Sequence, residues 1–227
     1  MLVVAHSSDV HLSHELEHGL LPLRRILLTA ERAGAHVVLL AGDTFDHVRQ
    51  PLGFFEEVAE LLDRAAAQVV ILPGNHDPLF DGSAAGWSCL ASAANVSVLG
   101  LSADSLLELP ALELGVWGRA HREYADMSPL AGTSRGKARW QVAMAHGHYS
   151  EVRPRPGIPC ASWLFFPDEI AGSGADYVAL GHWNICRTVA TSPVPAAYSG
   201  SPDYAGTINV IRFGDGGVEF GPEPLSE

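Results

Sequence analysis

The sequence has little that would suit an oxidising compartment or a membrane. It contains three cysteines, at positions 89, 160 and 186, and none of them stands in a CxxC pair. An odd count without paired spacing argues against a disulfide framework and for a reducing compartment. No apolar run reaches the length of a membrane span, and the N-terminal MLVVAHSSD reads as a strand rather than as a charged leader before an apolar core. We therefore expect a cytoplasmic protein that makes no membrane contact.

Basic residues are also scarce. Lysine and arginine together number 14 against 26 acidic residues, which gives a formal net charge of -12. This balance argues against a broad basic face for duplex DNA, because such binding comes mainly from lysine and arginine on phosphates. If the protein handles phosphate, local cations must neutralise it.

The chain does have enough apolar residues for one sizeable core. Its 227 residues are 47% hydrophobic, which predicts a single α/β domain over residues 1–227 and leaves little room for a second. Apolar strands alternate with two helical patterns, predicted over residues 15–33 and 53–67, and this indicates a sheet covered on both faces. The tail reads as antiparallel strands closed by a hairpin at Asp215, Gly216 and Gly217.

Five apolar strands end in polar residues of one chemical kind. These residues are Asp9 and His11, Asp43, Asn75 with His76 and Asp77, His146, and His182 with Asn184. The carboxyl ends of strands line the binding crevice of an open α/β sheet, so residues far apart in sequence would converge there. Carboxylate, imidazole and amide oxygen suit manganese, iron or zinc, and the number of ligands exceeds what one ion takes. We therefore expect two divalent ions, such as manganese, iron or zinc.

Spacing supports a shared site. In an extended segment residues i and i+2 point the same way, so Asp9 and His11 can bind one ion together. The same geometry is expected for His182 and Asn184. Asp43 is the natural bridge, because a carboxylate can give one oxygen to each of two ions held about 3.5–4 Å apart. Asn75 would supply a neutral oxygen to the second ion.

The blocks DVH, GDTFD, PGNHD, AHGH and GHWN follow one another in that order over nearly the whole chain. Together they resemble the five signature blocks of the calcineurin-like metallophosphoesterase superfamily. Each block is short, but the set is specific. The resemblance implies an α/β fold, a four-layer αββα sandwich with a dinuclear metal site at the C-terminal ends of the strands. It also implies a metal-dependent phosphoesterase, a hydrolase acting on ester bonds.

The resemblance further implies roles for individual residues. One ion is implied at Asp9, His11 and Asp43, with Asn184 where the family normally has a histidine, and the other at Asp43, Asn75, His146 and His182. His76 matches the histidine that contacts the phosphate and protonates the leaving oxygen, and Asp77 would orient that imidazole from behind. The two dications would lower the pKa of a bridging water, so that hydroxide is available for in-line attack near neutral pH.

Three more residues are candidates for substrate binding, each with a plainer interpretation. His148 shares a face with His146 and could contact phosphate, whereas His47 could touch substrate or be a solvated loop histidine. Arg49 could clamp a phosphate or pair with an acid at the rim. Trp183 is expected to pack on the flank of the sheet, although at a rim it could stack a base.

The segments HSSDVHL, GDTFD followed by Arg49 and Pro51, and AYSGSP resemble the SbcD-like DNA repair exonucleases more than small-molecule phosphatases. They imply a phosphodiesterase of DNA-exonuclease-like type. The plainer interpretation is that GDTFD only completes a metal-binding loop and that YSGSP is only a turn. The SbcD-like enzymes carry a DNA-binding cap and a segment that docks on an ATPase partner, and both are expected to be missing here, since only residues 203–227 follow Pro202. A short or single-stranded nucleic acid, or a small phosphodiester, is then the expected substrate.

Two alternatives stay open. The expected lack of a cap favours a phosphomonoesterase or cyclic-nucleotide phosphodiesterase that acts on a small substrate. The other is a catalytically weakened metal-binding scaffold protein, suggested by Asn184 because asparagine is a weaker ligand than imidazole. His76 and Asp77 argue against this decay, since a decayed site does not need its proton donor. An unidentified partner chain that supplies the missing binding surface also stays open.

Overall fold

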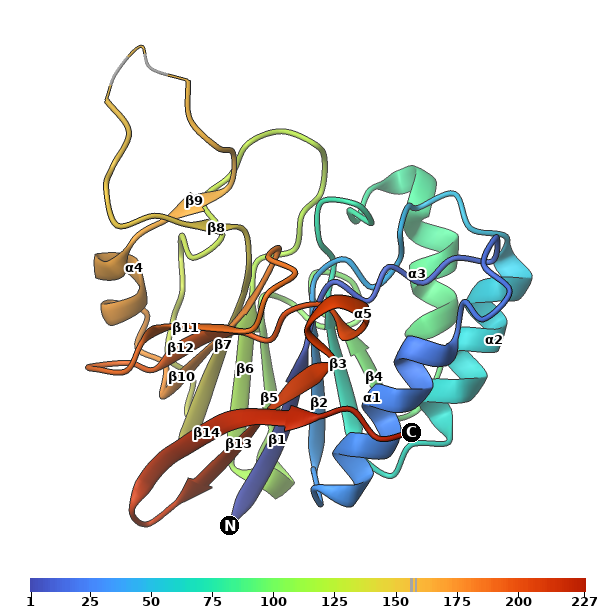
Figure 1. The fold of residues 1–227 in the computed structure, drawn as a ribbon, viewed down its shortest axis with the longest axis horizontal. Coiled ribbons are helices and arrows are strands. Elements are labelled where there is room, and N and C mark those ends of the chain that lie inside the picture. The colour runs from blue at the N-terminus through green and yellow to red at the C-terminus, as the bar shows by residue number, and fades with distance from the viewer. Residues whose placement is uncertain (156, 158) are drawn as a thin grey trace.

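The computed structural model describes residues 1–155, 157 and 159–227. Two sheets pack face to face between layers of helix (Figure 1). The first sheet has the order β14 (Gly217–Pro224), β13 (Thr207–Gly214), β1 (Leu2–Ser7), β2 (Val37–Ala41), β3 (Gln68–Leu72) and β4 (Val96–Val98). The second has the order β11 (Arg187–Ala190), β12 (Ala196–Tyr198), β10 (Tyr177–Gly181), β7 (Trp140–His146), β6 (Leu114–Gly118) and β5 (Leu106–Leu109). A small ladder joins β8 (His148–Tyr149) to β9 (Leu164–Phe165).

Helices complete the layers on the two outer faces. Those on the first sheet are α1 (Leu21–Arg32), α2 (Leu52–Asp63) and α3 (Ala84–Leu90), and α4 (Pro167–Ala171) lies on the second sheet (Figure 1). The short helix α5 (Pro202–Ala205) follows β12, and single 3-10 turns cover Asp81–Ser83 and Pro110–Leu112. The predicted αββα arrangement is therefore confirmed. Among the described residues, none of the helices has the length and apolar character needed to cross a bilayer.

Strand β2 shows why the central strands read as continuous apolar runs. Val37, Leu39 and Ala41 pack into the core between the two sheets. Val38 and Leu40 point the other way, into the core beneath the helices. Because side chains alternate along a strand, a strand covered on both faces must be apolar at every position. Burial on both faces holds the central strands in place, and with them the polar residues that follow their carboxyl ends.

The first predicted helix begins later than expected. The chain from residue 15 to residue 20 forms turns, with Gly19 N donating to Leu16 O and Leu21 N donating to His18 O. Helix α1 begins at Leu21 with Pro22 in its first turn. Proline suits this place because its missing N–H has no intrahelical partner there. The predicted start at residue 15 is therefore wrong.

The second predicted helix ends four residues early, at Asp63 instead of residue 67. The amide nitrogen of Asn95 lies 2.9, 3.0 and 3.1 Å from the carbonyl oxygens of Leu62, Ala65 and Ala67. This side chain satisfies carbonyls that helical N–H groups would otherwise need to reach, so the chain can leave the helix and enter β3. The predicted terminal hairpin is confirmed, since Gly214 pairs with Gly217.

His6 is a polar residue inside the core between the sheets. It stands on β1 and its Nε2 donates a hydrogen bond to Leu180 O at 3.2 Å, on β10 of the opposite sheet. The hydroxyl of Tyr177 lies 3.5 Å from its Nδ1. Burial lowers the pKa of His6 from 6.5 to about 3, despite the hydrogen bond to Leu180, so the ring stays neutral in the folded chain at ordinary pH.

This burial predicts a pH-dependent stability. Because the pKa of His6 in the folded chain lies below its unfolded value of 6.5, the unfolded chain takes up a proton first as the pH falls toward 3. His6 therefore stabilises the fold above pH 6.5, and this contribution is lost on acidification by up to about 1.4 kcal/mol per pH unit. In His6→Gln the free energy of unfolding, measured with urea at several pH values, should fall less steeply below pH 6.5. An unchanged slope would contradict the assignment; His18→Gln, at an exposed histidine, is the matched control.

Candidate metal centre

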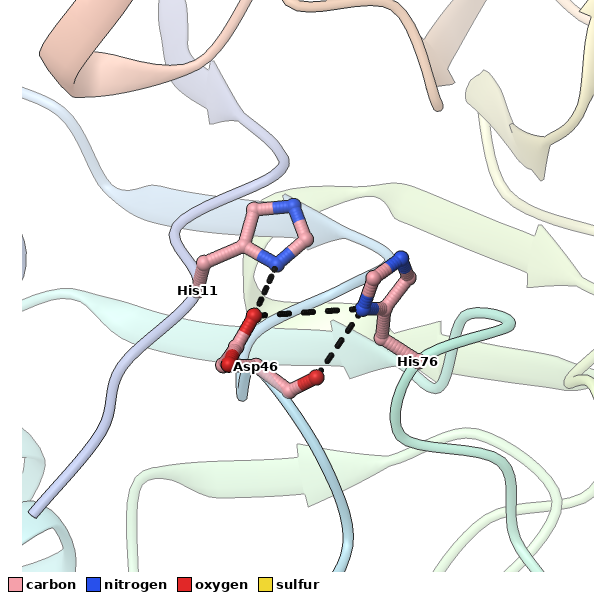
Figure 2. Close-up of side chains that lie close together, drawn as sticks. All are labelled: His11, Asp46 and His76. Carbon is pink, nitrogen blue, oxygen red and sulfur yellow. Dashed lines mark hydrogen bonds and ion pairs between the residues drawn. The ribbon is translucent and has the colours of Figure 1, made fainter. Parts of the chain in front are cut away.

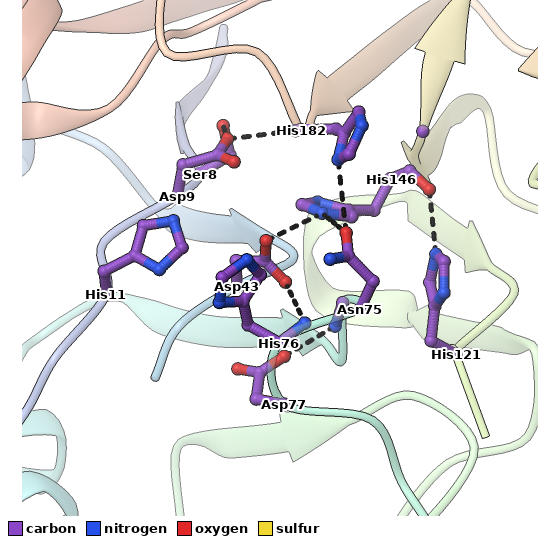
Figure 3. A network of polar contacts seen from close by, with 12 residues as sticks. Ser8, Asp9, His11, Asp43, Asn75, His76, Asp77, His121, His146 and His182 are labelled. Carbon is purple, nitrogen blue, oxygen red and sulfur yellow. Dashed lines mark hydrogen bonds and ion pairs between the residues drawn. The ribbon is translucent and has the colours of Figure 1, made fainter. Parts of the chain in front are cut away.

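The predicted ligands all lie at or just after the carboxyl ends of strands. They are Asp9 and His11 after β1, Asp43 after β2, Asn75 after β3, His146 at the end of β7, and His182 and Asn184 after β10. Strands β1, β2 and β3 are parallel neighbours in the first sheet, and β7 and β10 are parallel neighbours in the second. Their ends therefore open on the same edge of the molecule, where Asp9, Asp43, Asn75, His146 and His182 form one network of polar contacts (Figure 3).

Two groups of potential ligand atoms meet at Asp43. Within each group the atoms lie no more than 4.8 Å apart; the groups are Asp9, His11 and Asp43, and Asp43, His146 and His182. Asn75 joins the second group, since its Oδ1 is 3.0 Å from Nε2 of His146 and 3.1 Å from Nδ1 of His182. The structure thus brings together six of the seven predicted ligands, with the carboxylate expected to bridge at their centre.

His146 is oriented by a hydrogen bond between the two sheets. Its Nδ1 lies 2.9 Å from the carbonyl oxygen of Ala41, which can only accept, so Nδ1 donates and Nε2 points into the site, 3.1 Å from Asp43 Oδ2. Two glycines allow this approach. A Cβ at Gly42 would collide with Nδ1 of His146, and one at Gly181 would collide with the carbonyl oxygen of Ala41. The close contact of the sheets therefore requires glycine at both positions.

The backbone at the ligands is unusual. Asp9, His11, Asp43 and His182 have φ angles of 53°, 49°, 51° and 104°, a region that non-glycine residues rarely adopt. Such strain persists where the surrounding structure over-determines it, and it gathers at functional sites. Asp9 and His11 do converge as predicted, but the reason given by the sequence is wrong, because neither residue is extended.

Burial and neighbouring charges set the pKa values of the site. Burial alone would lower the pKa of His146, but Asp43, which also accepts its hydrogen bond, and Asp9 raise it to about 9. Burial raises the pKa of Asp9, whereas for Asp43 the effect of burial is outweighed by His146, and its pKa falls below the usual range. Burial and His146 lower the pKa of His182 to about 4. The buried carboxylates thus need positive charge among the ligands.

The residues fit divalent ions. The donors are carboxylate oxygens, imidazole nitrogens and an amide oxygen, a set that suits borderline to hard cations. Within the described part of the chain, Nδ1 of His11 is buried without a hydrogen-bond partner, and it lies 3.5 Å from Asp46 Oδ1. A buried polar atom without a partner is costly, so this nitrogen is an added sign of a ligand position.

The imidazole of His76 is held by Asp46 and not by Asp77. Nδ1 of His76 donates to the carbonyl oxygen of Asp46 at 2.9 Å and lies 3.9 Å from its Oδ1 (Figure 2). The two carboxylate oxygens of Asp77 instead accept the backbone N–H groups of Gly74 and Phe45, at 2.7 and 2.9 Å. The prediction that Asp77 orients the ring is therefore wrong. Its buried carboxylate holds the loops after β2 and β3 together.

Asp46 is a residue that the sequence interpretation missed. Its Oδ1 lies near both His11 and His76, and these three residues form a third close group of potential ligand atoms. The signal was present, since Asp46 is the second carboxylate of the GDTFD block, three residues after Asp43, the predicted bridge. His121 also lies beside the site; it is fully buried, and its Nε2 lies 2.9 Å from the carbonyl oxygen of His146.

Asn184 stands apart from the other predicted ligands. Its side chain is exposed, while its backbone carbonyl accepts a hydrogen bond from Ser201 N at 3.2 Å. The φ of 104° at His182 breaks the alternation that would have placed Asn184 beside it. A role for Asn184 at the first ion therefore stays a prediction.

Among the predicted substrate-binding residues, His148 is the one tied to the site. Its ring centroid is 6.5 Å from that of His182, and its Nδ1 accepts a hydrogen bond from Trp183 Nε1 at 3.1 Å. Trp183 in turn stacks on Tyr198, with centroids 4.5 Å apart and planes at 8°. The expected packing of Trp183 on the sheet is confirmed, and it also fixes the ring of His148.

His47 and Arg49 lie on the loop after β2. Nδ1 of the half-buried His47 accepts the backbone N–H of Arg49 at 3.2 Å, and Arg49 itself is exposed. Among the described residues, His47 is not part of the close groups of potential ligand atoms around Asp43. The contact of His47 and Arg49 with substrate stays a prediction.

Known proteins match this chain at the level of family and fold. The family model described as calcineurin-like phosphoesterase matches residues 2–186. The metallophosphoesterase YhaO of Bacillus subtilis (strain 168), itself described as uncharacterized, is 24% identical over 224 residues, which cover 88% of this chain and 53% of YhaO. The chain thus spans about half the length of that relative.

Two solved structures support the fold. One is a crystal structure that aligns over 99% of this chain and 99% of its own, at a TM-score of 0.67 and 12% identity. The crystal structure of TT1561 of Thermus thermophilus aligns with 97% of this chain and 98% of its own, at a TM-score of 0.65 and 12% identity. Identities this low establish likeness of fold alone.

Substitution of Asn184 tests whether its exposed amide is a ligand of the first ion. If Asn184 contacts that ion, Asn184→His should raise the affinity of one of two Mn²⁺ binding steps by about tenfold or more, because imidazole is the stronger ligand and changes around a metal site are commonly worth about 10–100-fold. Isothermal titration of the metal-stripped protein with MnCl₂ measures this, and Asn184→Ala is the matched control, which should weaken the same step. If neither variant changes either step, Asn184 is not a ligand.

Proposed function

Because the chain belongs to the calcineurin-like phosphoesterase family, it is a metal-dependent phosphoesterase, and we propose that it is a phosphodiesterase of DNA-exonuclease-like type. The observation that carries the proposal is the position of Asp43 in two close groups of ligand atoms, an arrangement suited to two ions that act on one phosphate. The segments HSSDVHL, GDTFD and AYSGSP support the exonuclease-like type. The shortage of basic residues, 14 against 26 acidic ones, favours a short or single-stranded nucleic acid or a small phosphodiester over duplex DNA.

The proposed centre assigns ligands to each ion. Asp9, His11 and Asp43 would hold the first, with Asn184 near it, and Asp43, Asn75, His146 and His182 would hold the second. Bound at these positions, two divalent ions supply an activated water and neutralise the charge on the phosphate oxygens. Manganese is the proposed metal, with iron or zinc as alternatives that suit the same donors.

His76 is the proposed proton donor. Its backbone N–H donates to Asp43 Oδ1 at 2.9 Å, which holds the residue over the bridging carboxylate. Since Nδ1 is committed to the carbonyl oxygen of Asp46, Nε2 is the nitrogen left to face a leaving group. The side chain is 46% exposed, so it lies at the open mouth of the site. His76 would therefore give the proton on Nε2 to the departing oxygen while Asp46 keeps the ring in place.

His148 is the proposed phosphate contact. The indole nitrogen of Trp183 is a donor only, so Nδ1 of His148 accepts and the neutral ring carries its hydrogen on Nε2. An N–H donor fixed beside His182 can hold a non-bridging phosphate oxygen without taking part in proton transfer. His47 and the exposed Arg49, on the loop that carries Asp43, are assigned to more distant parts of the substrate.

A phosphomonoesterase or cyclic-nucleotide phosphodiesterase is the second candidate. The acidic balance of the chain favours it, because a small ester needs no extended basic surface. The weakened scaffold is a poorer account, since the ligand groups around Asp43 and the held ring of His76 are both in place.

A direct assay separates these candidates. With MnCl₂, the protein should hydrolyse bis-p-nitrophenyl phosphate and shorten single-stranded DNA, with less activity on the monoester p-nitrophenyl phosphate and on duplex DNA. A clear preference for the monoester, or for a cyclic nucleotide over any oligonucleotide, would select the second candidate. No turnover of any ester by protein that holds two ions would contradict both.

The proton donor can be tested through the leaving group. His76→Gln should lower kcat on a single-stranded oligonucleotide by about 10²–10⁴-fold, because its alkoxide leaving group needs a proton. The loss on bis-p-nitrophenyl phosphate should be much smaller, since nitrophenolate leaves without one. A stopped assay of oligonucleotide products and a continuous assay of nitrophenolate release measure the two kcat values. The manganese content is checked on the same samples.

Equal losses on the two substrates would show that His76 does not donate the proton. His18→Gln, at an exposed histidine on the loop before α1, is the matched control and should leave both rates unchanged.

A further inference from the structure

The segment Tyr198–Pro202, the YSGSP of the sequence, runs from the end of β12 into α5. It is linked to the candidate ligand Asp9 through Ser8. Ser199 is fully buried there, and its Oγ lies 2.9 Å from Oγ of Ser8, which is also fully buried. Ser8 Oγ in turn lies 2.5 Å from Oδ2 of Asp9. A chain of two hydroxyl groups therefore links the second sheet to a ligand delivered by the first.

The direction of this chain follows from its chemistry. Each hydroxyl has one hydrogen, and the ionised carboxylate of Asp9 can only accept, so Ser8 donates to Asp9. Ser8 Oγ is then the acceptor for Ser199, whose other acceptor, Gly200 O, is more distant at 3.1 Å. The backbone N–H of His182 donates to the same Oδ2 at 3.0 Å. Two hydrogen bonds thus occupy Oδ2 and leave Oδ1 of Asp9 available to the first ion.

We propose that Ser8 and Ser199 are positioning residues that select which oxygen of Asp9 is presented to the first metal ion. The inference rests on the proposed dinuclear centre and deepens it. The first position would depend strongly on Asp9, because Asn184, the residue predicted as its fourth ligand, is an exposed amide in place of an imidazole. Groups that orient a metal ligand commonly change metal affinity by about 10–100-fold when they are removed.

The rest of the segment holds Ser199 in place. The hydroxyl of Tyr198 donates to Gly147 O at 2.8 Å, directly after His146, and accepts from Tyr149 N at 2.9 Å, in β8. On the other side, Ser201 N donates to Asn184 O. The segment is therefore anchored to the loops that follow β7 and β10, and Ser199 extends from it to the loop that follows β1. One short turn connects the ligand loops of both sheets.

Stepwise metal binding tests the inference. Isothermal titration of the metal-stripped full chain with MnCl₂ should give two steps for the wild type. Ser8→Ala should weaken one step by about 10–100-fold and leave the other unchanged. Ser199→Ala should weaken the same step by a smaller factor, and the double variant should be no worse than Ser8→Ala, because Ser199 acts through Ser8.

The matched control is Ser7→Ala. Ser7 is the neighbouring fully buried serine, and within the described residues its Oγ has no hydrogen-bond partner, so the substitution removes a similar group without touching Asp9. Both steps should keep their affinity in this variant. Thermal unfolding without metal gives the second readout: a purely structural role would lower Tm in the Ser8 and Ser199 variants while both metal affinities stayed at wild-type values.

The outcomes separate the two proposals. If the wild type binds two ions and neither Ser8→Ala nor Ser199→Ala alters a step, the inference is wrong and the centre stands. If both steps weaken equally, the hydroxyl chain does not act through Asp9, and the inference is also wrong. If the wild type binds fewer than two ions, the proposed centre itself fails, and the inference with it. Should Ser8→Ala not fold, Ser199→Ala, two contacts away from Asp9, decides alone.

Discussion

The hydrogen bond from His146 to the carbonyl oxygen of Ala41 joins the two sheets at the edge where the ligands meet. The rest of the site depends on it, because it sets the distance between ligands delivered by β1, β2 and β3 and those delivered by β7 and β10. Glycines 42 and 181 leave no side chain in the contact. A wider gap would move His146 and His182 away from Asp43, and the two ligand groups would no longer share a carboxylate.

This closeness concentrates charge in a buried place. Asp9 and Asp43 are both nearly inaccessible, and the chain balances them internally with His146, whose pKa they raise. Hydrogen bonds to single oxygens then give each carboxylate a defined face. Ser8 and His182 occupy one oxygen of Asp9, and His76 N occupies one oxygen of Asp43. The other oxygen of Asp9 takes neither of these bonds, whereas Oδ2 of Asp43 lies 3.1 Å from Nε2 of His146. Divalent cations bound here would replace the positive charge that His146 otherwise supplies.

The candidate ligands could be picked out from the sequence because each ends or follows an apolar strand, and parallel strands open on one edge. The residues that orient those ligands could not be found in this way. Ser8 and Ser199 are 191 residues apart, and their contact exists only because β12 joins the second sheet and that sheet lies against the first. Asp46 holds the ring of His76 in place of Asp77, and it does so chiefly through its backbone carbonyl, a contact that residue spacing does not encode. Helix ends were misplaced for the same kind of reason, since the amide of Asn95 comes from a distant part of the chain.

Two metal ions on either side of Asp43 would explain why the ligands of both sheets converge on this carboxylate. Diffraction data from crystals grown with MnCl₂, collected at the manganese absorption edge, test this most directly. We expect two anomalous peaks about 3.5–4 Å apart, one near Asp9 and His11 and the other near Asn75, His146 and His182, with the carboxylate of Asp43 between them. A single peak, or a pair of peaks that does not include Asp43 in both coordination shells, would contradict the dinuclear centre.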